Sequence, residues 1–523
     1  MNLIAIHTGH DGSVSVCSNN KLLFHQQIDR YNKSKHQAYP SFELINKINS
    51  FNLSFDKVIF TAISHRSVTD LWQDIFKNGL LKCNKNCEVY AHLDKHHDFH
   101  AFSSAWFFNE HIDYHIVWDG NGSTYNLGDN FYCFENTSIY DGQFNLLNKQ
   151  CHTSDNVNYK DNNFVISSNL QIGKAYEQVV KELKIGVHNE GKVMALSSWG
   201  KINKDLKKQL LFNNNFSSNY FKTQKDFTLN NINYYKLLPN LTTNINDKES
   251  HDFLKTFQST CEEIAFNTVN KYNNKTIALS GGVTQNVLIN SHLAKTNNKI
   301  LANPLCSDQG ISLGALYFYT QGNLEKKEGI YLGFKPNYNL EIFNQYKVVD
   351  CDSIEVAKIV YKEPVALFQG PSEQGQRGLG NRSLLINAFD KDCLNKINLI
   401  KRREWYRPFA CSVLKEELHK WFYPLKVDSS YMMFVLKSKK KMLNVTSKDG
   451  LCRAQSVDKI KNKHYHDLLK NYQKLYKVPL LLNTSLNMPG HTMVETLEDL
   501  RYIFEHTELK YAWLPEIQKL IIK

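Results

Sequence analysis

The sequence predicts an α/β protein with a duplicated core, because three apolar stretches of strand length each end in a glycine turn. These junctions lie at residues 3–11, 115–120 and 276–282. Helical stretches, such as residues 250–271, separate them along the chain. Strands that alternate with helices are typical of a mainly parallel sheet with helices packed on its faces. We therefore expect two related α/β halves.

Two related halves of this kind enclose a nucleotide in actin-like ATPases, and the glycine segments of this chain suit that task. Gly281 and Gly282 follow a strand and precede Asn286 at the start of a helix, where backbone N–H groups attract phosphate. Glu190 offers a carboxylate to a ribose, and Lys192 offers an ammonium group to a phosphate. Each segment alone also fits an ordinary tight turn. Their combination favours an actin-like nucleotide site.

The chain is expected to divide into a larger and a smaller domain. Charged sequence with glycine and proline at residues 325–352 follows a helix-like stretch and indicates a boundary. We predict a larger domain over residues 1–345 and a smaller α/β domain over residues 354–523. The asparagine-rich segments 156–163 and 213–244 are predicted to be insertions or loops outside the core.

Length and composition are those of a globular multidomain protein. The 523 residues allow two to four domains at roughly 100–200 residues each, and 42% of them are hydrophobic. No run of about 18 apolar residues occurs, and residues 1–7 read as a buried strand rather than a signal peptide. We expect a soluble, cytoplasmic protein without a membrane partner. Its 11 cysteines form no paired metal-binding clusters, which favours reduced thiols.

Two histidines and two aspartates form a candidate metal site. His96 and His100 are one helical turn apart, so their imidazoles project from one face of a helix. Asp119 and Asp308 follow expected strands, where their carboxylates can close the site. Two nitrogens and two oxygens suit a divalent cation such as iron, zinc or manganese. A histidine pair at this spacing, taken alone, would also fit ordinary packed or surface histidines.

The chain carries a surplus of positive charge. Lys and Arg number 63 against 51 Asp and Glu, which gives a net charge of +12. This surplus favours phosphates, anionic small molecules or nucleic acid as partners. Abundant lysine and asparagine would equally follow from an AT-rich genome, so the charge alone identifies no partner.

A second set of candidate residues lies in the carboxy-terminal part and suits an anion. Arginine forks, a lysine point charge and a serine hydroxyl can hold phosphate and a planar, amide-like group. These residues are Arg377, Arg382, Lys401, Arg407, Arg453 and Ser485. The charged run 401–407 alone would also fit a solvated basic face. Arg377 and Arg382 lie among glycines with few side chains to shield them, so we expect them to contact a ligand.

Together these motifs resemble those of the O-carbamoyltransferase family, which includes nodulation, tobramycin and cephamycin carbamoyltransferases. The resemblance extends in order along nearly the whole chain. The matching motifs are Gly9-His10-Asp11, Lys33-Ser34-Lys35-His36, His96-His97 with His100-Ala101, Asp119-Gly120, Glu190-Gly191-Lys192-Val193-Met194, Gly281-Gly282-Val283 with Asn286, Asp308, Gly380-Asn381-Arg382-Ser383, Arg403-Glu404 with Arg407-Pro408-Phe409-Ala410, and Asn483-Thr484-Ser485.

The resemblance implies a fold and a two-step reaction. The larger domain would be similar to the core of the tRNA threonylcarbamoyladenosine transferase, and the smaller one would be YrdC-like, similar to the enzyme that forms the adenylate of that pathway. In this family the smaller domain combines carbamoyl phosphate with ATP to give carbamoyl-adenylate and pyrophosphate. The larger domain transfers the carbamoyl group to an alcohol and releases AMP.

The resemblance also implies roles for individual residues. Metal ligands would be His96, His100, Asp119 and Asp308, with iron(II) most typical of the family and ATP entering with Mg(II). Residues around the adenylate in the larger domain would be Glu190, Lys192, Gly281, Gly282 and Asn286. The carbamoyl phosphate and adenylation site would be lined by Lys401, Arg407, Arg453 and Ser485, helped by Arg377. His10 and Lys35 would lie near the acceptor, where an imidazole can take the proton of the attacking hydroxyl.

The chain departs from the family pattern at several positions. Pro371 and Gln376 stand in segments where the family commonly has Gly-Arg-x-Glu and Gly-Pro-Arg-Ala-Leu-Gly, so one phosphate-reaching arginine is missing. Cys411 and Glu495 replace a commoner proline and cysteine. These departures affect the expected details of the adenylation pocket more than the expected reaction.

The acceptor is the least determined part of the sequence-based hypothesis. The positive charge favours a hydroxymethylated pyrimidine, as a nucleotide or in DNA, over the sugar and antibiotic hydroxyls that most relatives modify. Two alternatives stay open: threonylcarbamoylation of tRNA, and a non-catalytic actin-like scaffold that binds ATP. A symmetric homodimer is the default expectation for assembly.

Overall fold

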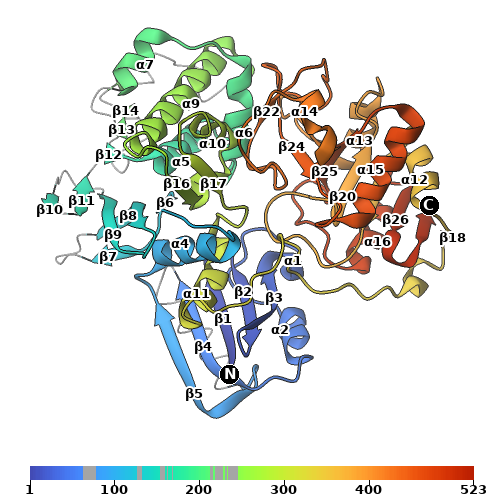
Figure 1. The fold of residues 1–523 in the computed structure, drawn as a ribbon, viewed down its shortest axis with the longest axis horizontal. Helices are drawn as coiled ribbons and strands as arrows, with labels where there is room; N and C mark the ends of the chain where they lie inside the picture. The colour runs from blue at the N-terminus through green and yellow to red at the C-terminus, as the bar shows by residue number, and fades with distance from the viewer. Residues whose placement is uncertain are drawn as a thin grey trace.

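The computed structural model describes residues 1–62, 78–126, 132–153, 159–161, 163–167, 169–211, 216–217, 228–229, 232–233 and 245–523. Figure 1 shows two α/β lobes beside a third α/β body that carries the C-terminus. Much of the asparagine-rich segments 156–163 and 213–244, predicted as insertions or loops, lies outside the described residues. Within the described part of the chain, no helix has both the length and the apolar character needed to cross a bilayer.

The first lobe is built on a five-stranded sheet in the order β3-β2-β1-β4-β5. Its strands are β1 (Asn2–Thr8), β2 (Ser13–Ser18), β3 (Lys21–Gln27), β4 (Phe55–Ala62) and β5 (Cys83–His92). Strand β2 runs antiparallel to β1 and β3, whereas β4 runs parallel to β1 and β5. Helix α1 (Ile28–Asn32) follows β3, and α2 (Phe42–Asn49) packs its buried face into the core of this lobe.

The second lobe repeats this arrangement. Its central strands run in the order β9-β8-β6-β16-β17, with β8 antiparallel to β6 and β9, and β16 parallel to β6 and β17. The strands of this sheet are β6 (Tyr114–Trp118), β7 (Thr124–Asn126), β8 (Tyr132–Asp141), β9 (Leu146–Thr153), β10 (Tyr159–Asp161), β11 (Phe164–Ser167), β16 (Thr276–Ser280) and β17 (Lys299–Ala302). The same strand order in both lobes confirms the predicted duplicated, actin-like α/β core.

Two helices pack between the sheets of the two lobes. Helix α4 (His96–Phe107) lies on β6 and β16 of the second sheet, and α11 (Ile311–Tyr319) lies on β1 and β2 of the first. The helices cross closely because Gly314 on α11 lacks a side chain, and a Cβ there would stand 1.9 Å from the carbonyl oxygen of Phe99. This contact brings the start of α4, with its histidines, to the junction between the lobes.

Further elements complete the second lobe. Helices α5 (Ile172–Glu182), α6 (Glu190–Leu196), α9 (Lys248–Val269) and α10 (Val287–Leu293) contribute to the core on the outer face of its sheet, and α7 (Lys204–Leu211) packs on α9. Short strand pairs are β12 (Asn169–Leu170) with β13 (Phe216–Ser217), and β14 (Thr228–Leu229) with β15 (Ile232–Asn233).

The third body contains an eight-stranded mixed sheet in the order β18-β27-β26-β19-β20-β25-β21-β24. Its strands are β18 (Lys347–Asp350), β19 (Val365–Phe368), β20 (Arg382–Ile386), β21 (Ala410–Leu414), β24 (Ala454–Val457), β25 (Leu480–Ser485), β26 (Tyr511–Leu514) and β27 (Lys519–Ile522). A small ribbon, β22 (Leu436–Lys437) with β23 (Leu451–Cys452), stands apart.

Helices cover both faces of this sheet. Helices α12 (Ser353–Val360) and α15 (Lys463–Tyr476) share one core with the sheet, and α13 (Cys393–Lys401) and α16 (Leu497–His506) share the other, near the short α14 (Leu418–Trp421). We call this unit the C-terminal body. The division into residues 1–345 and 354–523 stays a prediction.

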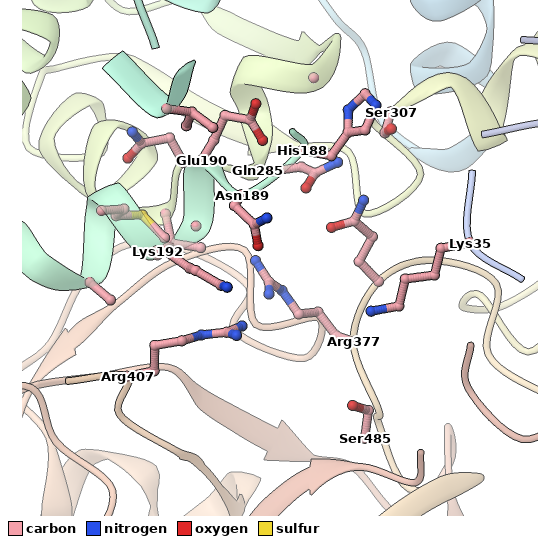
Figure 2. A pocket seen from close by; sticks show the side chains of 18 of the residues that line it. Lys35, His188, Asn189, Glu190, Lys192, Gln285, Ser307, Arg377, Arg407 and Ser485 are labelled. Atoms are coloured by element: carbon pink, nitrogen blue, oxygen red, sulfur yellow. The ribbon is translucent and has the colours of Figure 1, made fainter. Parts of the chain in front are cut away.

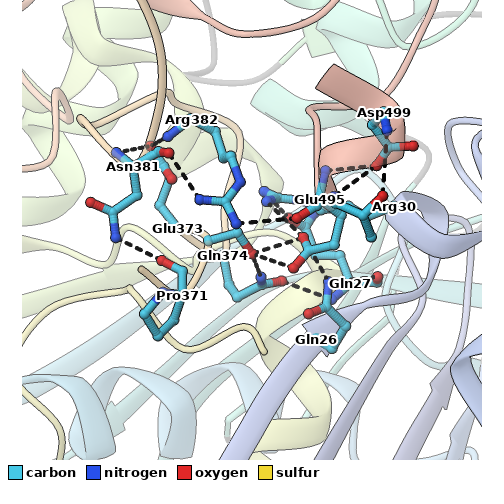
Figure 3. A network of polar contacts seen from close by, with 12 residues as sticks. Gln26, Gln27, Arg30, Pro371, Glu373, Gln374, Asn381, Arg382, Glu495 and Asp499 are labelled. Carbon is cyan, nitrogen blue, oxygen red and sulfur yellow. Dashed lines mark hydrogen bonds and ion pairs between the residues drawn. The ribbon is translucent and has the colours of Figure 1, made fainter. Parts of the chain in front are cut away.

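A buried polar network joins the C-terminal body to the first lobe (Figure 3). Arg30 on α1 lies 3.6 Å from the carboxylate of Glu495, which also accepts hydrogen bonds from the Ser372 hydroxyl. The backbone N–H of Gln27 donates to the side chain of Gln374 over 2.8 Å. Because Arg30 and Glu495 are both almost fully buried, this network fixes α1, and the loop that follows it, against the C-terminal body.

Candidate active site

The four predicted metal ligands converge at the junction of the two lobes. His96 and His100 lie on the first two turns of α4, Asp119 directly follows β6, and Asp308 begins a short 3-10 helix before α11. One nitrogen or oxygen atom from each residue lies within 4.8 Å of the others. The Nε2 atoms of His96 and His100 are each 3.3 Å from Oδ2 of Asp119.

The donor atoms of this cluster fit a divalent cation. All four side chains are buried, and Nε2 of His100 faces the carboxylates of Asp119 and Asp308 at 3.3 and 3.6 Å without the geometry of a hydrogen bond to either. Buried polar atoms in such an arrangement are costly unless a further group, such as a cation, satisfies them. Burial alone would raise the pKa of Asp119, but contacts with His100 and His96 lower it, so its carboxylate is ionised and available as a ligand.

Asp308 connects this cluster to two more histidines. Its Oδ1 faces His96 at 3.5 Å, whereas its Oδ2 lies 3.4 Å from Nε2 of His7 and 3.2 Å from Nδ1 of His10. The charge of Asp308 raises the pKa of His10 to about 10. His7 was not predicted as a site residue. In the sequence, His7 stands out only as a polar residue inside an apolar strand that ends at the glycine turn.

One cavity of about 1210 Å³ adjoins the cluster and is bordered by both lobes and the C-terminal body. Figure 2 shows Lys35, Lys192, Arg377 and Arg407 reaching into it from different segments. Twelve predicted site residues line it: His10, Lys35, Asp119, Glu190, Lys192, Gly282, Asn286, Arg377, Lys401, Arg407, Arg453 and Ser485. Gly281, His96, His100 and Asp308 are not part of this lining, and neither is Arg382. Asp119 therefore belongs to both the cavity wall and the metal-type cluster.

The side of the cavity formed by the C-terminal body is strongly cationic. Among the described residues, no carboxylate forms an ion pair with Arg377, Lys401, Arg403 or Arg453 of this body, or with Lys35 of the first lobe, and all five line the cavity. Burial, together with neighbouring arginines, lowers the pKa of Lys401 and of Arg453, and that of Arg403 to about 9. Cations gathered without counter-ions in a confined space favour a polyanionic ligand.

Local backbone contacts hold Lys401 at this wall. Its Nζ donates to the carbonyl oxygens of Ser485 and Asn487 over 2.7 and 2.8 Å. Lys401 is the last residue of α13, and Ser485 the last of β25, so the end of a helix and the end of a strand meet here. Arg403 and Asn487 also line the cavity; both lie in the segments expected to handle an anion, although neither was predicted individually as a site residue.

Glu404 pairs with two of the cavity cations. Its Oε1 is 2.8 Å from Nζ of Lys192 in the second lobe, and its Oε2 is 3.1 Å from Nη1 of Arg407 in the C-terminal body. Burial alone would raise the pKa of Glu404, but the hydrogen bond from Lys192 and the charge of Arg407 lower it to about 2. One ionised carboxylate therefore links the two bodies across the cavity.

The glycine segment of the second lobe, at residues 281 and 282, has a backbone that lets another chain segment approach it closely. Gly281 adopts φ = +83°, and a Cβ there would lie 2.2 Å from the carbonyl oxygen of Trp118. Asn286 lines the cavity, but its side chain already caps α10 by accepting from the N–H groups of Leu288 and Ile289. Any nucleotide contact by Asn286 would therefore add to a structural role.

Arg382 does not contact the cavity, contrary to the sequence-based expectation. It is fully buried in β20, donates to the carbonyl oxygens of Gln369, Gly370 and Glu495, and stacks on Phe368. Every residue of β20 is buried, so an arginine there must satisfy its guanidinium inside the protein. Its hydrogen bonds join the loop at Gln369 and Gly370 to the segment at Glu495.

Two departures from the family pattern are likewise placed away from the cavity. Glu495 belongs to the buried network with Arg30, and Cys411 packs in the core with its Sγ 3.5 Å from that of Cys452. Neither is part of the cavity lining, whereas Gln376 is. The departures at Glu495 and Cys411 therefore change the packing around the pocket rather than its walls.

Comparison with protein families gives two matches that together span most of the chain. The family model described as the carbamoyltransferase N-terminus matches residues 67–317, and that of the carbamoyltransferase C-terminus matches residues 356–520.

Individual relatives are distant in sequence. Nodulation protein NolNO of Sinorhizobium fredii is 29% identical over 372 residues, which cover 65% of this chain and 54% of that protein. An uncharacterized protein of Methanocaldococcus jannaschii is 29% identical over 343 residues, 60% of this chain and 55% of its own length. In both cases the match spans about half of the relative. A second uncharacterized protein of that archaeon is 24% identical over 533 residues, and the match covers 94% of this chain and 94% of that protein.

Proposed function

The chain belongs to the carbamoyltransferase family, and from this membership we propose that it is an ATP-dependent O-carbamoyltransferase with two reaction sites in one cavity. The supporting observation is the cavity itself, which has uncompensated cations on the C-terminal body at one side and Asp119 of the metal-type cluster at the other. A polyanion and an acceptor hydroxyl could thus share one cavity.

In the first step, carbamoyl phosphate and ATP would be joined at the cationic side. Water releases phosphate from carbamoyl phosphate, and an oxygen of the resulting carbamate attacks the α-phosphorus of ATP. A bond from carbamate oxygen to phosphorus forms, and pyrophosphate leaves with the electron pair. Lys401, Arg407, Arg453 and Ser485, helped by Arg377, would hold the phosphates, with Mg(II) on ATP.

In the second step, the acceptor hydroxyl would attack the carbamoyl carbon, and AMP would leave. Glu190, Lys192, Gly281, Gly282 and Asn286 would hold the adenylate in the second lobe. Nδ1 of His10 lies 3.2 Å from Asp308, whose charge favours the imidazolium, so His10 would have to be neutral before the attack to take the proton that the hydroxyl gives up. Lys35 would neutralise charge beside it. Enclosure of the adenylate excludes competing water.

A divalent cation would be held by His96, His100, Asp119 and Asp308, with iron(II) as the proposed metal. When bound, it would supply Lewis-acid stabilisation of negative charge that develops on the reacting group. The convergence of four buried donor atoms within 4.8 Å of one another supports this assignment.

For the acceptor we propose a 5-hydroxymethylpyrimidine, as a nucleotide or in DNA, with a sugar or antibiotic hydroxyl as the alternative. Net charge of +12 supports a phosphate-bearing acceptor.

The test is to incubate the protein with carbamoyl phosphate, Mg-ATP and Fe(II), and to follow pyrophosphate. Hydroxymethylated nucleotide, hydroxymethylated DNA and a sugar are then compared by mass spectrometry for the gain of one carbamoyl group. Pyrophosphate release that depends on carbamoyl phosphate is expected. ATP binding without pyrophosphate release would instead identify a non-catalytic scaffold, and carbamoylation of the sugar alone would remove the nucleotide acceptor.

A further inference from the structure

Glu404 occupies a position between two cations that the proposed function assigns to phosphate. Lys192 would contact the adenylate, and Arg407 would contact carbamoyl phosphate and ATP, yet in the free protein both charges are directed to one carboxylate. The carboxylate divides its oxygens between them, one to each. A phosphate that enters the cavity would meet cations that already have a partner.

The turn that carries Glu404 is anchored independently of these ion pairs. Trp405 packs edge-on against Trp199 of the second lobe, with ring centroids 4.9 Å apart, and Tyr406 is buried in the core of that lobe. The turn is closed by a hydrogen bond from the N–H of Arg407 to the carbonyl oxygen of Glu404. The position of the carboxylate is therefore set by packing, and removal of its charge should leave the turn in place.

The side chains of Glu404, Lys192 and Arg407 are partly exposed, which leaves room for them to exchange partners. The side chains of Lys192, Arg407 and Glu404 are 22%, 32% and 34% exposed, so all three reach solvent inside the cavity. By contrast, the other five cavity cations form no ion pair with a carboxylate among the described residues, although the charge of Glu404 also acts on Lys35 and Arg403. Within the described chain, Glu404 thus forms ion pairs with two of the cavity cations, Lys192 and Arg407.

We propose that Glu404 is a displaceable counter-ion, which holds Lys192 and Arg407 together between turnovers and competes with the nucleotide phosphate for both. This inference rests on the proposed function, because it takes the competing ligand to be ATP, the adenylate or AMP. Between turnovers, the carboxylate prevents repulsion between the two cations. After transfer, its return to them favours the departure of AMP. Glu404 is a positioning residue in this scheme, since it acts on the substrate through the two cations.

The test is calorimetric titration of AMP into the wild-type protein and into Glu404→Gln, which keeps the size of the side chain and removes its charge. We expect AMP to bind about tenfold more tightly to the variant at low salt, because the variant lacks one charge-assisted contact that competes with the phosphate. Adenosine, which lacks the phosphate, should bind both proteins equally. Glu417→Gln is the control, because Glu417 also pairs with a lysine, the exposed Lys420, but does not line the cavity.

The outcomes separate the possible explanations. A purely structural role for Glu404 predicts unchanged or weaker AMP binding in the variant, and either result would overturn the proposal. An equal gain in adenosine affinity would also overturn it, because the effect would then come from pocket shape rather than charge. If wild-type protein binds AMP but never releases pyrophosphate from ATP and carbamoyl phosphate, the proposed function is wrong. The role of Glu404 is still decided separately, by the AMP affinities of the wild type and the variant.

Discussion

Replacement of Glu495 by glutamine should destabilise the protein through the buried charge that it leaves behind. Arg30 and Glu495 are each about 2% exposed and 3.6 Å apart, so the guanidinium of Arg30 would lose its counter-ion in a dry site. Breaking a buried pair by removing one partner typically costs 3–5 kcal/mol. Arg30 keeps hydrogen bonds of 2.8 and 3.0 Å to Gln27 and Gly375, which places the expected loss near the lower end, at about 3 kcal/mol.

The assay is urea unfolding of Glu495→Gln and of a matched surface variant, Asp350→Asn. Asp350 also pairs with a cation, Lys519, but is 87% exposed, so its loss should change stability by less than about 0.5 kcal/mol. The double variant Arg30→Met with Glu495→Leu should recover part of the loss, because no unpaired charge remains. If Glu495→Gln were no less stable than Asp350→Asn, the reasoning about this network would be refuted.

The remaining predictions concern the metal cluster, the anion pocket and the glycine segment. His100→Ala and Asp308→Ala should each retain less than about a tenth of the divalent metal bound by wild type, as measured by plasma mass spectrometry; full retention would contradict the ligand assignment. Arg453→Ala should slow carbamoyl-phosphate-dependent pyrophosphate release by about a hundredfold while the fold, followed by circular dichroism, is kept. A variant as fast as wild type would exclude Arg453 from the site. Gly281→Ala should lower the free energy of unfolding by at least about 2 kcal/mol, because residue 281 has a positive φ and a Cβ there would clash with Trp118. An unchanged free energy of unfolding would show that the loop relaxes.

The sequence contained enough local information to predict the duplicated core. Strands β1, β6 and β16 are short apolar runs that end at glycine, and this signal depends only on neighbouring residues. The pairing of strands far apart in the chain, such as β16 with β6, does not leave a local pattern. Helix α4 packs on both of these strands, and that contact is present only in the complete fold.

Candidate ligands were predictable where spacing carries the information. His96 and His100 repeat with the period of a helix, so one face of α4 could be inferred. His7 had no such partner in sequence, because its contact with Asp308 is made across the lobe. Arg382 was misassigned for a physical reason. Glycines nearby suggested an open loop, but the residues from 382 onward form a completely buried strand.

The polar partners of Glu404 could not have been predicted from its sequence position. A glutamate in a run of basic residues reads as ordinary surface charge. Its importance comes from Lys192, more than two hundred positions earlier, which approaches only because Trp405 and Tyr406 pack onto the second lobe.

The cavity is lined by segments far apart in the sequence, from His10 in the first lobe to Met493 in the C-terminal body. During synthesis both lobes leave the ribosome before residues 485–493, which supply part of the cationic wall. The cavity can therefore capture a ligand only after the C-terminal body has folded against the lobes.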